Sequence, residues 1–166
     1  VREVDPEGLV TYVNYPSTEY LQLPFADLLS FNVYLESQAR FEAYLPRLQN
    51  LAGDRPLLIT ELGLDSLRNG LEAQATMIEG QVRSAFAWGT CGVFVYAWTD
   101  EWHRSGEDVT DWDFGLVRRD RTAKPALGAV RRAFEDDLLP RPGAAPRISI
   151  VVCTYNGART LRDCLE

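Results

Sequence analysis

The chain has 166 residues, of which 46% are hydrophobic, 25% charged and 11% aromatic, a composition typical of a globular protein with a packed core. With 17 Lys and Arg residues against 24 Asp and Glu residues, the net charge is -7, which offers little positive charge to phosphates, so no nucleic-acid partner is expected. No stretch approaches the roughly 18 consecutive apolar residues of a membrane span, and no targeting segment is visible.

Four short apolar segments are predicted to form strands. Their side chains are apolar at consecutive positions and rich in branched and aromatic types, which is typical of parallel strands buried on both faces. These segments are residues 9–13, 28–34, 56–60 and 92–98.

Helical spacing of apolar residues follows in three other segments, at 41–51, at 71–86 and from Pro125 to Leu138. Gly53 and Gly89 stand where helix C-caps belong, and Pro46 is expected to kink or restart the first helix. Strands alternating with helices predict an α/β fold with right-handed crossovers.

The composition changes after the last helix. Residues 136–146 contain three prolines without apolar periodicity, which is typical of a stiff linker, and a new strand is predicted at 147–153. Three domains are therefore expected, at 1–135, 136–146 and 147–166. The start without Met and the break at the end suggest a chain cut from a longer polypeptide.

Three cysteines without a C-x-x-C pair argue against a disulfide framework or a zinc site. Cys91, Cys153 and Cys164 are interpreted as free thiols, which fits a reducing compartment.

Glu61 is the residue that most strongly suggests chemistry. It ends an otherwise apolar strand and is followed two residues later by Gly63, which allows close approach of backbone or ligand. A buried charge is costly unless it is paired or functional. Position alone leaves two interpretations open, a functional carboxylate, or a Glu that caps the next helix or pairs with a neighbouring strand end.

Several motifs taken together resemble the C-terminal half of a glycoside hydrolase family 2-like barrel, the β-galactosidase, β-mannosidase and β-glucuronidase group. The resemblance covers about residues 1 to 135. The motifs are Ser30-Phe31-Asn32-Val33-Tyr34, Thr60-Glu61-Leu62-Gly63, Val95-Tyr96-Ala97-Trp98-Thr99-Asp100-Glu101-Trp102, Asp113-Phe114-Gly115-Leu116 and Lys124-Pro125-Ala126.

The resemblance implies that the four strands are the fifth to eighth of an eight-stranded (β/α)8 TIM barrel. Glu61 then matches the catalytic nucleophile, Tyr34 the tyrosine that orients it, and Trp98 the aromatic floor of the sugar subsite, with Asn32 also near the sugar. The chemistry fits these roles, because a retaining glycosidase needs a carboxylate nucleophile and a carboxylic acid about 5 Å apart. Core packing at strand ends is the alternative for each.

The match lacks the family's second catalytic residue. The acid/base glutamate follows an asparagine at the end of the fourth strand, and residues 1–8 contain no such pair. Complete barrels of this type use about 250 residues. The chain alone is therefore expected to be inactive, with its acid/base residue upstream of Val1.

The loop after the fourth predicted strand is expected to form a wall of the cleft. Asp100 and Glu101 are candidates for hydrogen bonds to sugar hydroxyls, although solvated loop charges are the more common explanation. Trp102 and His103 belong to the same loop. Because no metal-ligand spacing such as H-E-x-x-H is present, neither a metal nor another cofactor is expected.

The last 20 residues carry a second resemblance. The run Ile148-Ser149-Ile150-Val151-Val152-Cys153-Thr154-Tyr155-Asn156-Gly157 is similar to the opening of family 2 inverting glycosyltransferases. That likeness implies that Thr154 and Tyr155 lie against the base of a nucleotide-sugar donor. An ordinary strand, turn and helix is the alternative.

Two classes of function follow. The first is a retaining glycoside hydrolase fused to a glycosyltransferase, and the second is a non-catalytic carbohydrate-binding barrel that regulates or tethers the transferase. Nucleotide sugars are made in the cytoplasm, so a cytoplasmic location is expected. A half barrel exposes two strand edges, so the chain is also expected to self-associate.

Overall fold

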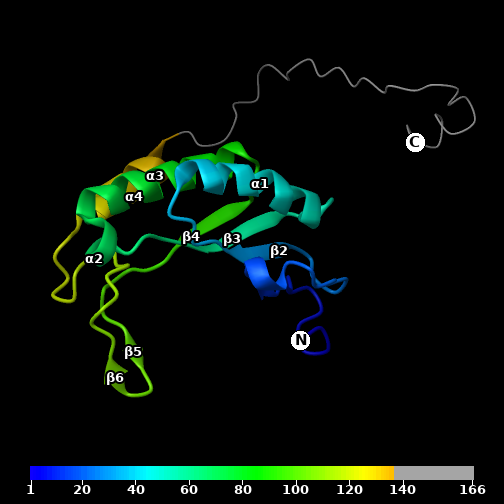
Figure 1. The fold of residues 1–166 in the computed structure, drawn as a ribbon. Coiled ribbons are helices and arrows are strands. Elements are labelled where there is room, and N and C mark those ends of the chain that lie inside the picture. Colours follow the sequence, from blue (N-terminus) through cyan, green and yellow to red (C-terminus); the bar gives the residue numbers. More distant parts are fainter. Residues whose placement is uncertain (137–166) are drawn as a thin grey trace, which may run out of the picture.

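The computed structural model describes residues 1–136 and has an α/β architecture in which helices cover one face of a parallel sheet (Figure 1). The strands are β1 (Val13–Asn14), β2 (Leu29–Asn32), β3 (Leu57–Leu62) and β4 (Gly92–Val95). They are parallel and adjacent in chain order. The predicted α/β fold is thereby confirmed. The expected strand at 147–153, Thr154 and Tyr155 lie outside the described residues.

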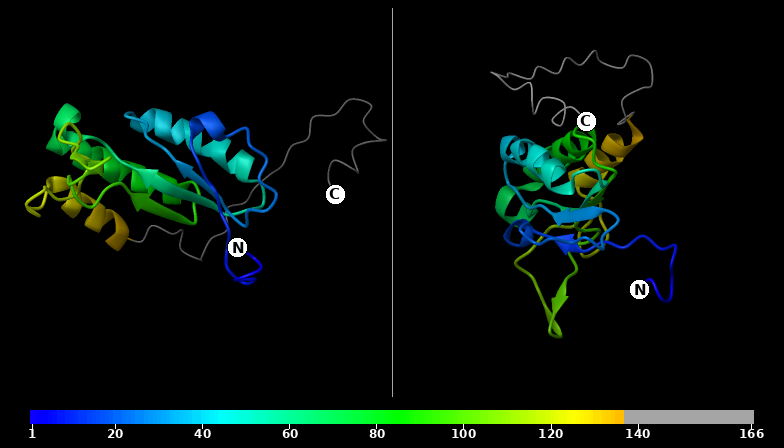
Figure 2. Two further views of the ribbon diagram at one scale, coloured as in Figure 1. Left: turned by 90° about the horizontal axis from the view of Figure 1, so that it is seen from below. Right: turned by 90° about the vertical axis from the view of Figure 1, so that its right-hand side faces the viewer.

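Three long helices pack on the same face of this sheet, as two further views show (Figure 2). They are α1 (Gln38–Ala52), α3 (Leu71–Ala87) and α4 (Pro125–Glu135). Smaller elements are the 3-10 turn η1 (Pro16–Thr18), the short helix α2 (Ser66–Asn69), and the hairpin of β5 (His103–Arg104) and β6 (Glu107–Asp108), which projects away from the helices.

Two local expectations needed correction. Only Val13 of the predicted strand 9–13 belongs to β1, because Val10 N and Thr11 Oγ1 instead bond to Asp27 Oδ2 and Leu28 O. Helix α1 also continues through Pro46. Phe41 and Leu45 before the proline and Leu48 after it are all fully buried in one core, so tertiary packing holds both halves of the helix in line.

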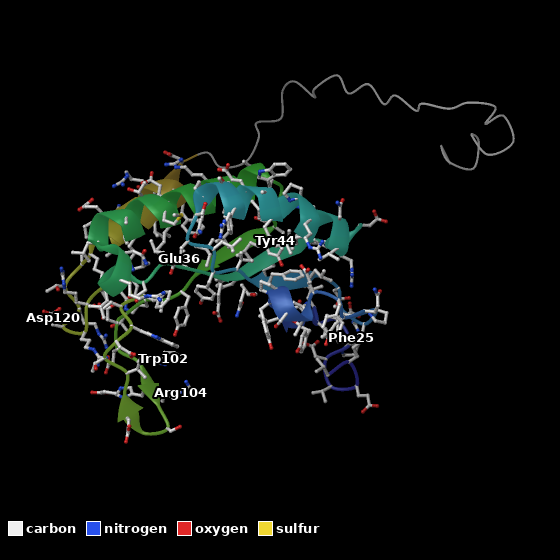
Figure 3. The ribbon with its side chains drawn as sticks, viewed as in Figure 1. Phe25, Glu36, Tyr44, Trp102, Arg104 and Asp120 are labelled. Atoms are coloured by element: carbon white, nitrogen blue, oxygen red, sulfur yellow. The ribbon has the colours of Figure 1, made fainter. Side chains whose placement is uncertain are left out.

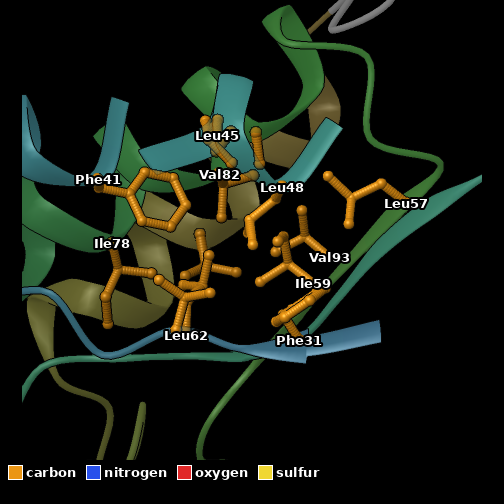
Figure 4. Close-up of a cluster of buried hydrophobic side chains, with 14 of the residues drawn as sticks. Phe31, Phe41, Leu45, Leu48, Leu57, Ile59, Leu62, Ile78, Val82 and Val93 are labelled. Atoms are coloured by element: carbon orange, nitrogen blue, oxygen red, sulfur yellow. The ribbon is translucent and has the colours of Figure 1, made fainter. Parts of the chain in front are cut away.

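The hydrophobic core lies between the sheet and the helices (Figure 4). Phe31, Ile59 and Leu62 enter it from the strands, where alternate side chains point to the same face. The helices complete it with side chains that are equally buried, namely Phe41, Leu45 and Leu48 of α1 and Ile78 and Val82 of α3.

The other face of the sheet has no such cover within residues 1–136. Phe94, which alternates with the buried Val93 along β4, is 61% exposed. Burial of the strands on both faces, as the sequence predicted, therefore holds for only one face of the described structure. The physical reason is that all three long helices lie on the same side.

The carboxyl ends of the strands meet at one edge of the sheet, and this edge positions the site. Asn32 at the end of β2 is in register with Glu61 of β3. Val33 N donates to Glu61 O at 2.8 Å, and Tyr96 N donates to Leu62 O at 2.8 Å. The residues that follow β2 and β4 are therefore held beside the end of β3.

Candidate active site

Glu61 and Tyr34 make direct contact at this edge. The Tyr34 hydroxyl donates to Glu61 Oε2 at 2.5 Å, across two neighbouring strands. Burial raises the pKa of Tyr34 above its usual value, and the hydrogen bond to the Glu61 carboxylate and its charge raise it further. The phenol therefore keeps its proton at neutral pH and acts as the donor of this bond.

Aromatic rings surround the pair in mainly edge-to-face contacts. Tyr34 has its ring centroid 6.1 Å from that of Tyr96 and 5.8 Å from that of Phe114. Tyr96 also lies 5.7 Å from Trp102. Such contacts between rings hold each aromatic plane in a defined orientation. The Glu61 carboxylate therefore lies beside rigid apolar surfaces.

These residues line a cleft of about 650 Å³, which is within the usual range of ligand pockets. Trp102, at the base of the β5–β6 hairpin, and Trp112 are neighbours in its wall, with ring centroids 6.5 Å apart and planes inclined by 31° (Figure 3). The lining residues are Tyr34, Glu61, Arg68, Tyr96, Trp102, Asp111, Trp112 and Phe114.

The cation of the lining is already paired. Arg68 of α2 donates through Nε to Asp65 Oδ2 at 3.1 Å and through Nη2 to Glu36 Oε1 at 2.9 Å. Asp65 itself is buried and caps α2 by accepting from Leu67 N. Besides Glu61, the lining contains one other carboxylate, that of Asp111.

The structure places the other predicted site residues outside this lining. Trp98 is 60% exposed and lies two residues beyond Tyr96, which is the aromatic residue that reaches the cleft. Asn32 accepts a hydrogen bond from Thr60 Oγ1 at 2.8 Å. Glu101 pairs with Arg121, whose guanidinium lowers the pKa of the Glu101 carboxyl.

Asp100 is buried, with 4% of its side chain exposed, in an ion pair with Lys124. Its Oδ1 also accepts from Gly115 N at 2.8 Å. We therefore correct the expectation that Asp100 binds sugar hydroxyls and assign it a structural role, because its carboxylate is occupied by protein donors.

Residue spacing did not single out four members of the lining, namely Arg68, Tyr96, Trp112 and Phe114. Tyr96 had a detectable signal, since it is the first residue after β4 and therefore lies at the same edge as Glu61. Trp112 and Phe114 come from a long loop whose path local sequence does not encode.

No group of three or more His, Cys, Asp or Glu side chains that could hold a metal ion occurs within residues 1–136. In the same part of the chain, no helix is long and apolar enough to cross a membrane. Cys91 is an exposed free thiol.

Neither a protein-family model nor a curated protein sequence matches the chain. Solved structures do. A Ruminococcus gnavus β-glucuronidase matches with a TM-score of 0.59 and 19% identity, over 76% of this chain and 26% of that protein. GH5_18 from Streptomyces cattleya, solved with GlcNAc, matches with a TM-score of 0.65 and 19% identity, over 85% of this chain and 41% of that protein.

Xylanase 10B from Thermotoga maritima matches with a TM-score of 0.57 and 17% identity, over 82% of this chain and 50% of that protein. The chain thus spans half the length of these three proteins or less. Its fold is that of part of a glycoside hydrolase (β/α)8 barrel, and this likeness concerns the fold alone.

Proposed function

We propose that the chain carries the nucleophile and part of the sugar-binding cleft of a retaining glycoside hydrolase. The observation that supports this most directly is the 2.5 Å hydrogen bond from Tyr34 to Glu61 at the carboxyl ends of parallel strands, inside an aromatic cleft. In (β/α)8 barrels this is the edge where active sites lie.

Tyr34 occupies Oε2 of Glu61, which leaves Oε1 to attack the anomeric carbon. The glycosidic oxygen leaves with a proton from a second carboxylic acid, and water later hydrolyses the glycosyl ester. By the resemblance to family 2 hydrolases, that acid lies upstream of Val1. The chain alone is therefore expected to act only on substrates whose leaving group departs without a proton.

The cleft is proposed to hold the sugar through its aromatic walls, because a ring can cover the C–H face of a pyranose while the Glu61 carboxylate faces its anomeric carbon. Trp112→Ala is expected to weaken binding about tenfold, or by about 1.4 kcal/mol, through the loss of one apolar wall. The measurement is titration calorimetry with β-linked trisaccharides of glucose, xylose, mannose and N-acetylglucosamine.

Two further variants make this test specific. Trp98→Ala separates the cleft geometry from the family resemblance, and Trp88→Ala, at the end of α3, is a matched control far from the lining. Unchanged binding in Trp112→Ala together with weakened binding in Trp98→Ala would contradict the proposed sugar site.

The uncovered sheet face supports self-association of the chain as a further part of the proposal. Phe94 is exposed on that face, and β1 and β4 are edge strands of the described sheet. Light scattering is expected to show a mass that rises with concentration, and Phe94→Glu should shift the chain toward the monomer. A wild-type monomer at every concentration, without dye binding, would contradict this expectation.

The glycosyltransferase fusion is proposed from the sequence of residues 147–166, with Thr154 and Tyr155 at the donor base. The cytoplasmic location is proposed with it, since the transferase would use cytoplasmic nucleotide sugars.

A further inference from the structure

A buried ammonium group lies behind the aromatic wall of the cleft. The side chain of Lys124 is 1% exposed. Its Nζ donates to Asp100 Oδ1 at 2.6 Å, to Ser66 Oγ at 2.9 Å and to Asp113 O at 3.1 Å. An ammonium has three donors, so every donor of Lys124 has a partner.

These partners come from four different segments. Lys124 precedes α4, Asp100 is in the loop after β4, Ser66 is the first residue of α2, and Asp113 stands between Trp112 and Phe114 of the cleft wall. One side chain therefore ties the segment with these two aromatic residues to three other parts of the fold.

The same segment has further polar anchors. Asp113 N donates to Asp65 Oδ1 at 3.0 Å, and Ser66 N donates to Asp113 O at 3.0 Å. A Cβ at Gly115 would approach Asp100 N to 2.3 Å, so the two loops are in close backbone contact. The wall is thus attached from behind by groups that do not enter the cleft.

We propose that the buried Lys124–Asp100 pair is a positioning device that holds Trp112 and Phe114 against Tyr34 and Glu61. Replacing a buried ion pair with neutral groups of similar size commonly preserves stability, whereas removing one partner leaves an unpaired charge. The distinctive contribution of the pair is therefore to select one loop arrangement. The inference rests on the proposed function only for what the wall binds.

The test uses the double variant Lys124→Met with Asp100→Asn in the full chain. It leaves no unpaired buried charge, and the Asn oxygen can still accept from Gly115 N. Ser66→Ala is a milder variant that removes one partner of the ammonium while both charges stay paired. Arg131→Met with Glu135→Gln is the matched control, because it neutralises an exposed pair on α4.

Amide hydrogen exchange reads the position of the wall without any sugar. We expect exchange at residues 113–117 to rise at least tenfold in the double variant and about threefold in Ser66→Ala, while the core amides of β3 and α3 and the control variant stay at wild-type rates. A purely structural pair would instead raise exchange in the core and the wall together. That result, or unchanged exchange at 113–117 in a folded variant, would overturn the proposal.

Trisaccharide binding is the second readout. We expect affinity to fall at least tenfold in the double variant, in parallel with the exchange at the wall. Wild-type affinity in a variant whose wall exchanges rapidly would overturn the link between the pair and the cleft. If the wild-type chain binds no sugar, the proposed function fails, and the exchange experiment still decides whether the pair positions the wall.

Discussion

Glu61→Gln is expected to abolish covalent labelling of the chain by activated 2-fluoro glycosyl fluorides, slowing it by roughly a thousandfold or more. An amide cannot form the glycosyl ester, whereas the carboxylate held by Tyr34 can. Fluoride leaves without a proton, so the experiment needs only the nucleophile and not the acid. Intact mass and peptide mapping after incubation with gluco, galacto, manno and xylo reagents are the measurements.

The controls separate the nucleophile from other carboxylates. Asp111→Asn removes the second carboxylate of the cleft lining, and Glu72→Gln removes an exposed one in the first turn of α3. Only Glu61→Gln should lose the label. A label mapped to Asp111 would contradict the assignment, and a wild-type chain that binds trisaccharides but is never labelled would identify the non-catalytic carbohydrate-binding module.

Tyr34→Phe is expected to slow the same labelling reaction by about one to three decades, the scale seen when one positioning donor is lost. The Phe ring keeps its edge-to-face contacts with Tyr96 and Phe114, so the cleft should retain its shape. The maximal labelling rate should therefore fall while the reagent concentration at half-maximal rate changes little.

Tyr44→Phe is the matched control for this substitution. The Tyr44 hydroxyl of α1 donates to Glu19 Oε2 at 2.8 Å, the same type of bond outside the cleft. Its loss should leave labelling unchanged. Equal slowing in both variants would mean that Tyr34 acts only through general stability, and an unchanged rate in Tyr34→Phe would remove its role as a positioning residue.

The strands around Glu61 could be predicted because their signals are local. Apolar runs marked β2, β3 and β4, although β4 ends at Val95 and not at residue 98. Parallel strands end at one edge, so Glu61 and Tyr34 could be expected to meet from their positions alone. Their chemical roles remain predictions that the labelling experiments address.

Choosing the aromatic residues of the cleft required the tertiary structure. Trp98 and Tyr96 stand in the same apolar run, and only the end of β4 and the bond from Tyr96 N to Leu62 O place Tyr96 at the level of Glu61. Trp112 reaches the same cleft through a loop with no periodic pattern, so its position depends on what anchors that loop.

By itself, the sequence determined the α/β class, the alternation of strands and helices, and a carboxylate at a strand end, because these depend on the spacing of residues within one segment. Only the tertiary structure decided that Asp100 faces Lys124, 24 residues further on, and that the helices leave Phe94 uncovered. Pairing and burial depend on segments distant in sequence, and spacing within a segment contains no information about them.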